Sequence, residues 1–219
     1  AMHETAIRVP RWQIRDRREG VIVEWDVGLL EDLTPYPYRL HLEQHRLTPI
    51  IHARLRECAN AEVRFQHEVT GFSQTGDRVV VSAKTPGGVE QFEAGWLIGA
   101  DGGRSMVRQS MGVPFDGYTW PERFVVASTT YDFAPHGYTM NAYVADPEEW
   151  VAMFKMPDDG PPGLWRVIWP VPPEEDEAAT LEDANIERHV QRFQPKAGSY
   201  PVKYRGIYRV HQRVARDFR

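Results

Sequence analysis

The chain has 219 residues, which is enough for one large domain or two small ones with a buried core. Hydrophobic residues make up 42% of the sequence and aromatic residues 11%, and so much aromatic surface excludes a disordered acidic tail. Lys and Arg number 26 against 31 Asp and Glu, and the net charge of -5 argues against a general nucleic-acid binder, which needs a cationic face.

The cysteine count and the hydropathy pattern bear on location. One cysteine excludes an internal disulfide framework and fits a reducing compartment. No apolar run approaches the ~18 residues that cross a bilayer, and the N-terminus has no signal-peptide pattern. We therefore expect a cytoplasmic protein that has no membrane partner.

The first third of the chain predicts one strand and one helix. Residues 8–20 are polar and basic, whereas residues 20–27 are β-branched and partly alternating, which is typical of a strand. After the prolines at 35 and 37, apolar residues recur at helical spacing and predict a helix from Glu43 to Ala59. We expect Pro49 near its first turn and Cys58 buried on its apolar face.

The middle of the chain predicts a small sheet. Three β-rich runs, 61–73, 78–83 and 89–93, are separated by glycine-containing turns and predict an antiparallel meander. The following run, Trp96–Gly99, is continuously apolar and predicts a strand buried on both faces.

The last part of the chain predicts a larger sheet. Four runs rich in Val, Tyr, Phe and Trp are candidate strands: 124–132, 139–145, 150–156 and 164–170. Residues 181–193 predict an amphipathic helix. The fold class is therefore α+β, in which a large, mostly antiparallel sheet has its helices on one face.

The turn after Ile98 carries the chemistry. Asp101 can accept hydrogen bonds from sugar hydroxyls, and Arg104 and Arg108 can neutralise phosphate. Ser105 is a candidate N-cap of a short helix, and three glycines allow a close approach of backbone or ligand: Gly99, Gly102 and Gly103. The alternative is a plain strand-to-helix turn with two solvated arginines, since the Gly-x-Gly-x-x-Gly fingerprint is absent.

The run Gly99-Ala100-Asp101-Gly102-Gly103-Arg104-Ser105-Met106-Val107-Arg108 resembles the Asp-Gly motif of the class A flavoprotein aromatic hydroxylases, the para-hydroxybenzoate hydroxylase-like monooxygenases. The resemblance implies that this turn contacts FAD and the path taken by NAD(P)H. It implies that Asp101 lies near the flavin ribose and that four further residues complete the turn: Gly102, Arg104, Ser105 and Arg108.

Two further segments share this resemblance. Leu42–Ile51 resembles the family's segment that opens the helix before the meander, and Gln44 takes the place of a glutamine that hydrogen-bonds flavin. Val69 takes the place where backbone groups approach the adenine. Tyr208–Ala215 resembles the stretch just before the family's second flavin motif, a Gly-Asp followed by small residues.

The resemblance also implies a domain organisation. The family's N-terminal glycine-rich motif and C-terminal Gly-Asp motif are absent, so we expect a middle fragment that binds FAD weakly or not at all by itself. Residues 1–35 and 118–207 are expected to form a substrate-binding domain. Residues 36–117 are expected to form part of a FAD-binding domain, to which residues 208–219 return.

The implied activity of the parent protein is hydroxylation of a phenol-like aromatic substrate with FAD, NAD(P)H and O2. No residue is assigned a catalytic role. Two alternatives stay open: the same scaffold serving a flavin reductase or halogenase, and a non-catalytic substrate-binding module. The expected partner is a small aromatic substrate. A homodimer is the expected assembly.

Other signals favour structural roles. The zinc-protease motif is His-Glu-x-x-His, and the sequence from His41 to His45 departs from it, so we expect no metal site. An arginine-rich segment near the C-terminus favours a solvated or partner-facing surface over nucleic acid. Five aromatic residues on the late strands are expected mostly in sheet packing, with one or two in a substrate pocket: Tyr131, Tyr138, Tyr143, Trp165 and Trp169.

Overall fold

The computed structural model describes residues 2–219 and divides the chain into two compact units. The first unit comprises residues up to Ala53 together with Trp120–Val210, and the second comprises Arg54–Thr119 and His211–Arg219. Each unit is therefore discontinuous in sequence. The assignment of substrate-binding and FAD-binding roles to these parts stays a prediction.

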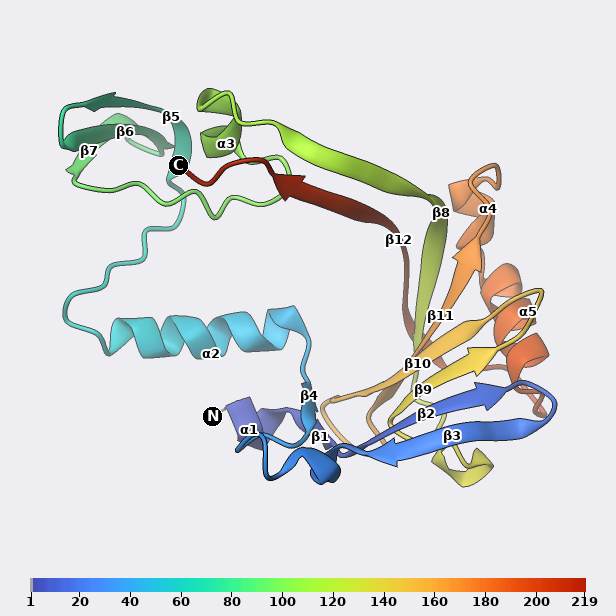
Figure 1. Cartoon of the computed structure of the whole chain (residues 1–219). Coiled ribbons are helices and arrows are strands. Elements are labelled where there is room, and N and C mark those ends of the chain that lie inside the picture. The colour runs from blue at the N-terminus through green and yellow to red at the C-terminus, as the bar shows by residue number, and fades with distance from the viewer. Residues whose placement is uncertain (1) are drawn as a thin grey trace. The chain divides into compact units, whose positions relative to one another are not determined.

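A seven-stranded sheet dominates the first unit (Figure 1). Across the sheet, the strands are β12 (Val202–Ala215), β8 (Phe115–Thr129), β11 (Leu164–Val171), β10 (Val151–Met156), β9 (Asn141–Ala145), β2 (Arg11–Asp16) and β3 (Gly20–Asp26). The β2–β9 pair is parallel, whereas β2–β3, β9–β10, β10–β11 and β8–β11 are antiparallel. The expected mostly antiparallel sheet is confirmed, including the strand at 20–27.

The basic segment 8–20 contains two strands that its composition does not predict. The first is β1 (Ile7–Val9), which pairs with β4 (Arg39–His41), and the second is β2 in the large sheet. Polar side chains are accommodated on β2 because they are paired: Gln13 is 2% exposed, and both Gln13 and Arg15 donate to the Gly137 carbonyl, at 3.2 and 2.6 Å. Shorter elements complete this unit: α1 (Met2–Thr5), η1 (Val27–Leu30), η2 (Ala134–His136) and α4 (Glu177–Thr180).

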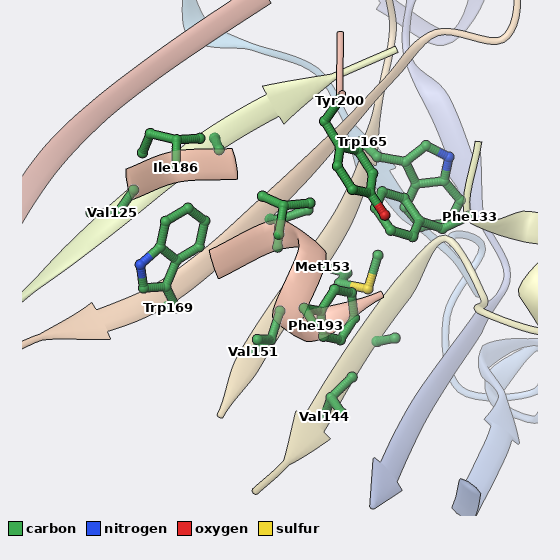
Figure 2. Packing of buried hydrophobic residues seen from close by; sticks show 14 of the residues in the cluster. Val125, Phe133, Val144, Val151, Met153, Trp165, Trp169, Ile186, Phe193 and Tyr200 are labelled. Carbon is green, nitrogen blue, oxygen red and sulfur yellow. The ribbon is translucent and has the colours of Figure 1, made fainter. Parts of the chain in front are cut away.

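The core lies on one face of the large sheet. Val125, Met153 and Val167 lie on three neighbouring strands and are at most 1% exposed. The helix α5 (Asp183–Phe193) covers this face with Ile186 and Val190, so the expected amphipathic helix is confirmed. Figure 2 shows an aromatic group at one end of the cluster: Phe133, Trp165 and Tyr200.

The opposite face of the sheet is mixed in character. Directly paired residues point to the same face, so one row crosses four strands and contains Asn141, Phe154, Arg166 and Ser128. The strand β4 lies near β10, and the His41 ring is 5.7 Å from the Phe154 ring. This face therefore carries charge and aromatic rings where the other carries the core.

The helix α2 (Gln44–Arg56) follows β4, as expected from its periodicity, with two differences. Pro49 is its sixth residue, so it lies beyond the first turn. The expectation of a buried Cys58 is wrong, because the cysteine is exposed and none of the helix's side chains is buried. Helical spacing shows which residues share a face, but burial requires a second element against that face.

The second unit contains the predicted meander, formed by β5 (Glu68–Thr75), β6 (Arg78–Thr85) and β7 (Gly88–Ala94). The strand expected over 61–73 begins only at Glu68. The expected buried strand at Trp96–Gly99 is wrong: Trp96 is 90% and Ile98 86% exposed. No strand among residues 2–219 hydrogen-bonds to this segment as a ladder partner, and an apolar run needs neighbours on both sides to become a buried strand.

The short helix α3 (Met106–Ser110) packs beside β5 in this unit (Figure 1). Its N-cap is Ser105, as the sequence predicts. Among residues 2–219, every helix is too short or too polar to traverse a bilayer.

Candidate functional site

The turn between Gly99 and α3 is organised by Asp101. One carboxylate oxygen accepts a hydrogen bond from Ser105 Oγ at 2.5 Å, and the other accepts from the backbone N–H groups of Met106 and Val107 at 2.7 and 3.2 Å. The Ser105 hydrogen bond lowers the pKa of Asp101. Ser105 Oγ in turn accepts from the Arg108 N–H at 3.0 Å, so the acid and the serine cap the helix together.

The two arginines of the turn differ in how they are used. Arg108 donates to the Gly103 carbonyl at 3.0 Å, and its guanidinium lies 4.2 Å from the Phe115 ring centroid. Arg104 is exposed. Arg104 therefore presents its charge to solvent, while Arg108 is partly committed to the turn itself.

The turn leaves open space beside its glycines. A Cβ added at Gly102 or Gly103 meets no atom within 4 Å, and Gly102 has a φ of +79°, which favours glycine. Bare backbone and the exposed guanidinium of Arg104 therefore face open space beside the turn. The FAD contacts expected of Asp101, Gly102, Arg104, Ser105 and Arg108 stay predictions.

The two remaining predicted cofactor contacts lie in different units. Val69 is on β5 of the second unit, 40% exposed, next to a strand irregularity between Val69 and Gly71. A shallow depression of about 540 Å³ lies beside it, lined by residues that include Glu68 and Lys84. Gln44 is in the first unit, at the start of α2, where its side chain is exposed.

A second candidate site is a pocket of about 520 Å³ within the first unit. Its walls include the apolar side chains of Val126 and Leu164 and the ring of Tyr208, whereas the Ile207 side chain packs against the core on the other face. Its charged residues are Glu43, Arg46, Asp158 and Arg166. The pocket lies on the sheet face opposite the core, because Val126 and Arg166 belong to that face.

Glu43 is the centre of the pocket's charge network. It lies 3.4 Å from Arg46 Nε and 3.5 Å from Arg166 Nη2, with its side chain 10% exposed. Arg46 also pairs with Asp159 at 3.0 Å, and Asp158 pairs with Lys203 at 2.5 Å. The network ties the start of α2 to β11 and to the loop after β10.

Several buried polar atoms of this network lack a hydrogen-bond partner among the described residues. They include Arg166 Nε. Glu43 Oε2 and Arg46 Nε also lack a hydrogen bond, but these two atoms lie 3.4 Å apart as an ion pair. Buried polar groups are normally paired, so the Nε donor of Arg166 is available to a ligand or to water in this pocket. The pocket is therefore built for a partly polar molecule.

A buried histidine lies on the same sheet face. His41 is 4% exposed, and its Nδ1 lies 2.8 Å from the Lys155 carbonyl oxygen, whereas its Nε2 has no partner among residues 2–219. Burial lowers the pKa of His41, and the nearby Arg39 and Arg166 lower it further. The neutral imidazole is therefore favoured in the folded state.

The pocket residues were missed from the sequence. Of the five aromatic residues considered, Trp165 and Trp169 are in the core, and Tyr131 and Tyr138 pack against it. Tyr143 lies on the opposite face, where it contacts Trp12 and Phe154. Tyr204 and Tyr208 of β12 line the pocket instead.

Metal binding has no cluster to support it. No group of three or more His, Cys, Asp or Glu side chains able to hold an ion is found within residues 2–219.

The arginine-rich C-terminal segment forms ion pairs with other residues of this chain. For example, Arg216 donates to the Asp116 carboxylate at 2.8 and 2.9 Å.

Comparison with known proteins places this chain in a family. The family model described as FAD binding domain matches residues 11–219. The para-nitrophenol 4-monooxygenase of Pseudomonas sp. (strain WBC-3) is 36% identical over 225 residues, covering all of this chain and 54% of the relative. The 6-hydroxy-3-succinoylpyridine 3-monooxygenase HspB of Pseudomonas putida (strain DSM 28022 / S16) is 32% identical, covering 93% of this chain and 50% of the relative.

Solved structures agree. The crystal structure of p-nitrophenol 4-monooxygenase from Pseudomonas putida DLL-E4 matches with a TM-score of 0.89 at 34% identity, covering all of this chain and 55% of that one. The flavin-dependent monooxygenase PieE, solved with FAD and substrate, shares the fold with a TM-score of 0.82 at 19% identity, over 98% of this chain and 40% of its own. The chain spans about half the length of the curated relatives it matches. It belongs to the FAD binding domain family and is related along its whole length to the class A flavin-dependent aromatic hydroxylases.

Proposed function

We propose that the protein containing this chain is a FAD-dependent monooxygenase that hydroxylates a small phenol-like ring with NAD(P)H and O2. The names of two relatives, para-nitrophenol 4-monooxygenase and 6-hydroxy-3-succinoylpyridine 3-monooxygenase, both describe oxidation of a small ring that bears a hydroxyl group. The proposal extends that substrate class to this protein.

The observation that carries the proposal is the pocket of about 520 Å³ in the first unit. Its volume is within the range of small-molecule sites, and its composition combines apolar walls with a few polar groups. Val126, Leu164 and the ring of Tyr208 suit a flat aromatic ring, while Arg166 and Ser128 offer donors to a polar substituent.

The chain's own share of the reaction is binding and orientation. When bound, FAD supplies the electron transfer and oxygen chemistry that no side chain provides. The apolar walls exclude water from the ring, and the charged network around Glu43 holds Arg166 in place. The turn from Asp101 to Arg108 and the residues Gln44 and Val69 are the proposed cofactor contacts.

The test uses the full-length protein. FAD content is measured by visible absorbance after desalting, and NADH and NADPH oxidation are followed with and without a series of phenols. The expected result is a yellow protein whose NAD(P)H oxidation is stimulated by a phenol and coupled to a hydroxylated product. NAD(P)H oxidation without any hydroxylated product would support a reductase or a halogenase, and a colourless full-length protein would support a binding module.

The remaining expectations also belong to this proposal. A homodimer is measured by light scattering of the purified full-length protein. A cytoplasmic location is measured by fractionation of the source cells.

A further inference from the structure

The loop that joins α5 to β12 closes around the side chain of Lys196. Lys196 Nζ donates to three consecutive backbone carbonyl groups, those of Ala197 at 3.1 Å, Gly198 at 2.8 Å and Ser199 at 2.6 Å. An ammonium group has three N–H donors and no acceptor, so these three carbonyl groups can satisfy all of its donors. The loop therefore surrounds one positive charge with its own backbone.

Two tyrosine rings complete the surroundings of this ammonium group. Lys196 Nζ lies 4.7 Å from the ring centroid of Tyr200 and 5.6 Å from that of Tyr131, within the roughly 6 Å over which cation–π attraction acts. Tyr200 is 6% exposed and its ring stacks on Phe133 (Figure 2). The rings are therefore held by the core and do not depend on the lysine for their position.

The carbonyl groups of the loop are also positioned by contacts that do not involve the ammonium group. On α5, Gln191 donates through Nε2 to the Gly198 carbonyl at 2.9 Å and accepts through Oε1 from the backbone N–H of residue 196 at 2.9 Å. The backbone N–H of Tyr200 donates to Glu187 Oε2 at 2.9 Å. The helix and the core therefore build most of the site, and the lysine fills it.

The site contains no counter-charge for the ammonium group. The other lysines of the first unit pair with carboxylates, Lys155 with Asp132 at 3.3 Å and Lys203 with Asp158 at 2.5 Å. Lys196 forms no ion pair within residues 2–219, and its charge is met by carbonyl dipoles and ring faces instead. Such neutral groups recognise a cation by its size and by the number of its N–H donors.

We propose that residues 194–201 and the ring of Tyr131 form a binding site for a small primary ammonium ion, and that the side chain of Lys196 is its resident ligand. The lysine is an intramolecular ligand, whose charge closes the loop that leads from α5 into β12. This inference is separate from the proposed function, because the site uses neither the pocket on the opposite sheet face nor the Asp101 turn.

Removal of the lysine side chain makes the site available to a free ligand. The atoms that Lys196→Ala deletes correspond to n-propylammonium, so this ion is the probe. In the full-length protein we expect Lys196→Ala to lower the melting temperature by about 3–6 °C, because three charge-assisted hydrogen bonds are lost. We expect about 100 mM n-propylammonium chloride to restore roughly half of that loss, relative to sodium chloride at the same ionic strength, and to leave the wild type unchanged.

Two other probes separate the N–H donors from charge and from apolar contact. Tetramethylammonium carries the same charge but has no N–H group, so it can face the rings but cannot donate to the carbonyl groups. The neutral molecule n-propanol has the same carbon chain without the charge. Neither probe is expected to restore the melting temperature of Lys196→Ala.

Two variants serve as matched controls. Lys196→Met keeps an unbranched side chain that occupies the path of the lysine stem but carries no charge, so we expect a similar loss of melting temperature and no recovery with n-propylammonium. Lys203→Ala removes a lysine of the same unit whose partner is the carboxylate of Asp158, and we expect no recovery that is specific to n-propylammonium.

The outcomes decide the inference in either direction. Recovery of Lys196→Ala by n-propylammonium, without recovery of Lys196→Met or Lys203→Ala, would support the ammonium site. An unchanged melting temperature in Lys196→Ala, the absence of recovery, or equal recovery with tetramethylammonium or in the control variants would overturn it. If Lys196→Ala does not fold in plain buffer, the yield of refolded protein with and without n-propylammonium replaces the melting temperature, again compared with Lys196→Met.

Discussion

Gly99 and Val107 lie so close together that no side chain fits at position 99. A Cβ added to Gly99 would lie 2.7 Å from Val107 Cβ and 2.8 Å from its Cγ1, both far inside van der Waals contact. Val107 is 9% exposed on the inner side of α3. The segment before the Asp101 turn therefore packs directly on the helix that follows it, and glycine is what permits this.

Replacing Gly99 with alanine is therefore expected to destabilise the second unit. Either the segment or α3 must shift, and overpacking of this kind costs about 1–3 kcal/mol. Urea denaturation followed by circular dichroism measures the loss. Gly103→Ala is the control, since a Cβ there meets nothing within 4 Å, and an equal loss in both variants would contradict the close-packing argument.

The elements that sequence predicts best are those with a local cause. The strand at 20–27, the meander and the four late strands all follow from β-branched alternation and glycine turns, and the structure contains them. The strand β2 was missed because its side chains are mostly polar and its parallel partner, β9, lies more than a hundred residues away in sequence. Such pairing leaves no mark within a short window.

The two candidate sites differ in the same respect: one is formed by a contiguous segment and the other by segments far apart in sequence. The Asp101 turn is contiguous, so its residue types and spacing reveal a capped turn and a family motif. The Arg166–Ser128 pair depends on the register of β11 against β8, and Glu43 arrives from a third segment. At Trp96 the sequence predicts burial that the structure does not contain, since this side chain is 90% exposed. An apolar run becomes a buried strand only where other elements cover it.

His41 is expected to make stability pH-dependent. Its pKa is lowered in the folded state by burial and by the charges of Arg39 and Arg166, while the Lys155 carbonyl opposes this shift. A lowered folded pKa means that the unfolded chain binds the proton more readily, so stability falls as pH drops below the ordinary histidine value of about 6.5. Above that value the contribution is fully present.

The measurement is a series of urea denaturation curves between about pH 8 and pH 5. The His41→Asn variant retains a side-chain N–H near the Lys155 carbonyl but cannot titrate, so its curve is expected to be flatter over this range. His45→Asn is the control, because His45 is exposed and its replacement removes a histidine from the same region. An unchanged slope in His41→Asn would show that other groups cause the dependence.

A hydrogen bond between a histidine and a buried carboxylate next to the core provides a second stability prediction. His189 Nδ1 lies 2.6 Å from Glu149 Oε2, and the imidazole stacks on Trp169 with ring centroids 5.2 Å apart. Glu149 is 7% exposed, and its other oxygen has no hydrogen-bond partner among residues 2–219. Loss of His189 thus leaves a buried carboxylate without its main partner.

The His189→Phe variant keeps an aromatic ring against Trp169 and removes the hydrogen bond. We expect it to lower the free energy of unfolding by about 1–3 kcal/mol, because an unsatisfied buried group keeps its desolvation cost. Arg192→Ala is the comparison, since Arg192 and Glu148 form an exposed pair on the same two segments, and exposed pairs contribute about 0–1 kcal/mol. Equal effects in both variants would mean that burial does not distinguish the two pairs.

The last prediction concerns Asp101 and the proposed cofactor site. Its carboxylate caps α3 through Ser105, Met106 and Val107, so Asp101→Ala disturbs the geometry of the turn from which Arg104 projects. In the full-length protein we expect lower flavin occupancy after desalting, with the large sheet intact by circular dichroism. Because the Ser105 hydrogen bond lowers the Asp101 pKa, the capped turn is expected to persist at neutral pH and to weaken only below about pH 4, as the carboxylate is protonated.

Two variants separate the cap from a general charge effect. Asp101→Asn keeps one carbonyl acceptor for the helix N–H groups, so its flavin occupancy is expected to lie between those of the wild type and Asp101→Ala. Asp77→Ala removes an exposed acid from the Gly76-Asp77 hairpin turn of the same unit and is expected to leave occupancy unchanged. Unchanged flavin occupancy in Asp101→Ala would show that this turn is not part of the cofactor site. Equal losses of occupancy in Asp101→Ala and Asp77→Ala would assign the effect to net charge, because both changes remove one negative charge from the second unit.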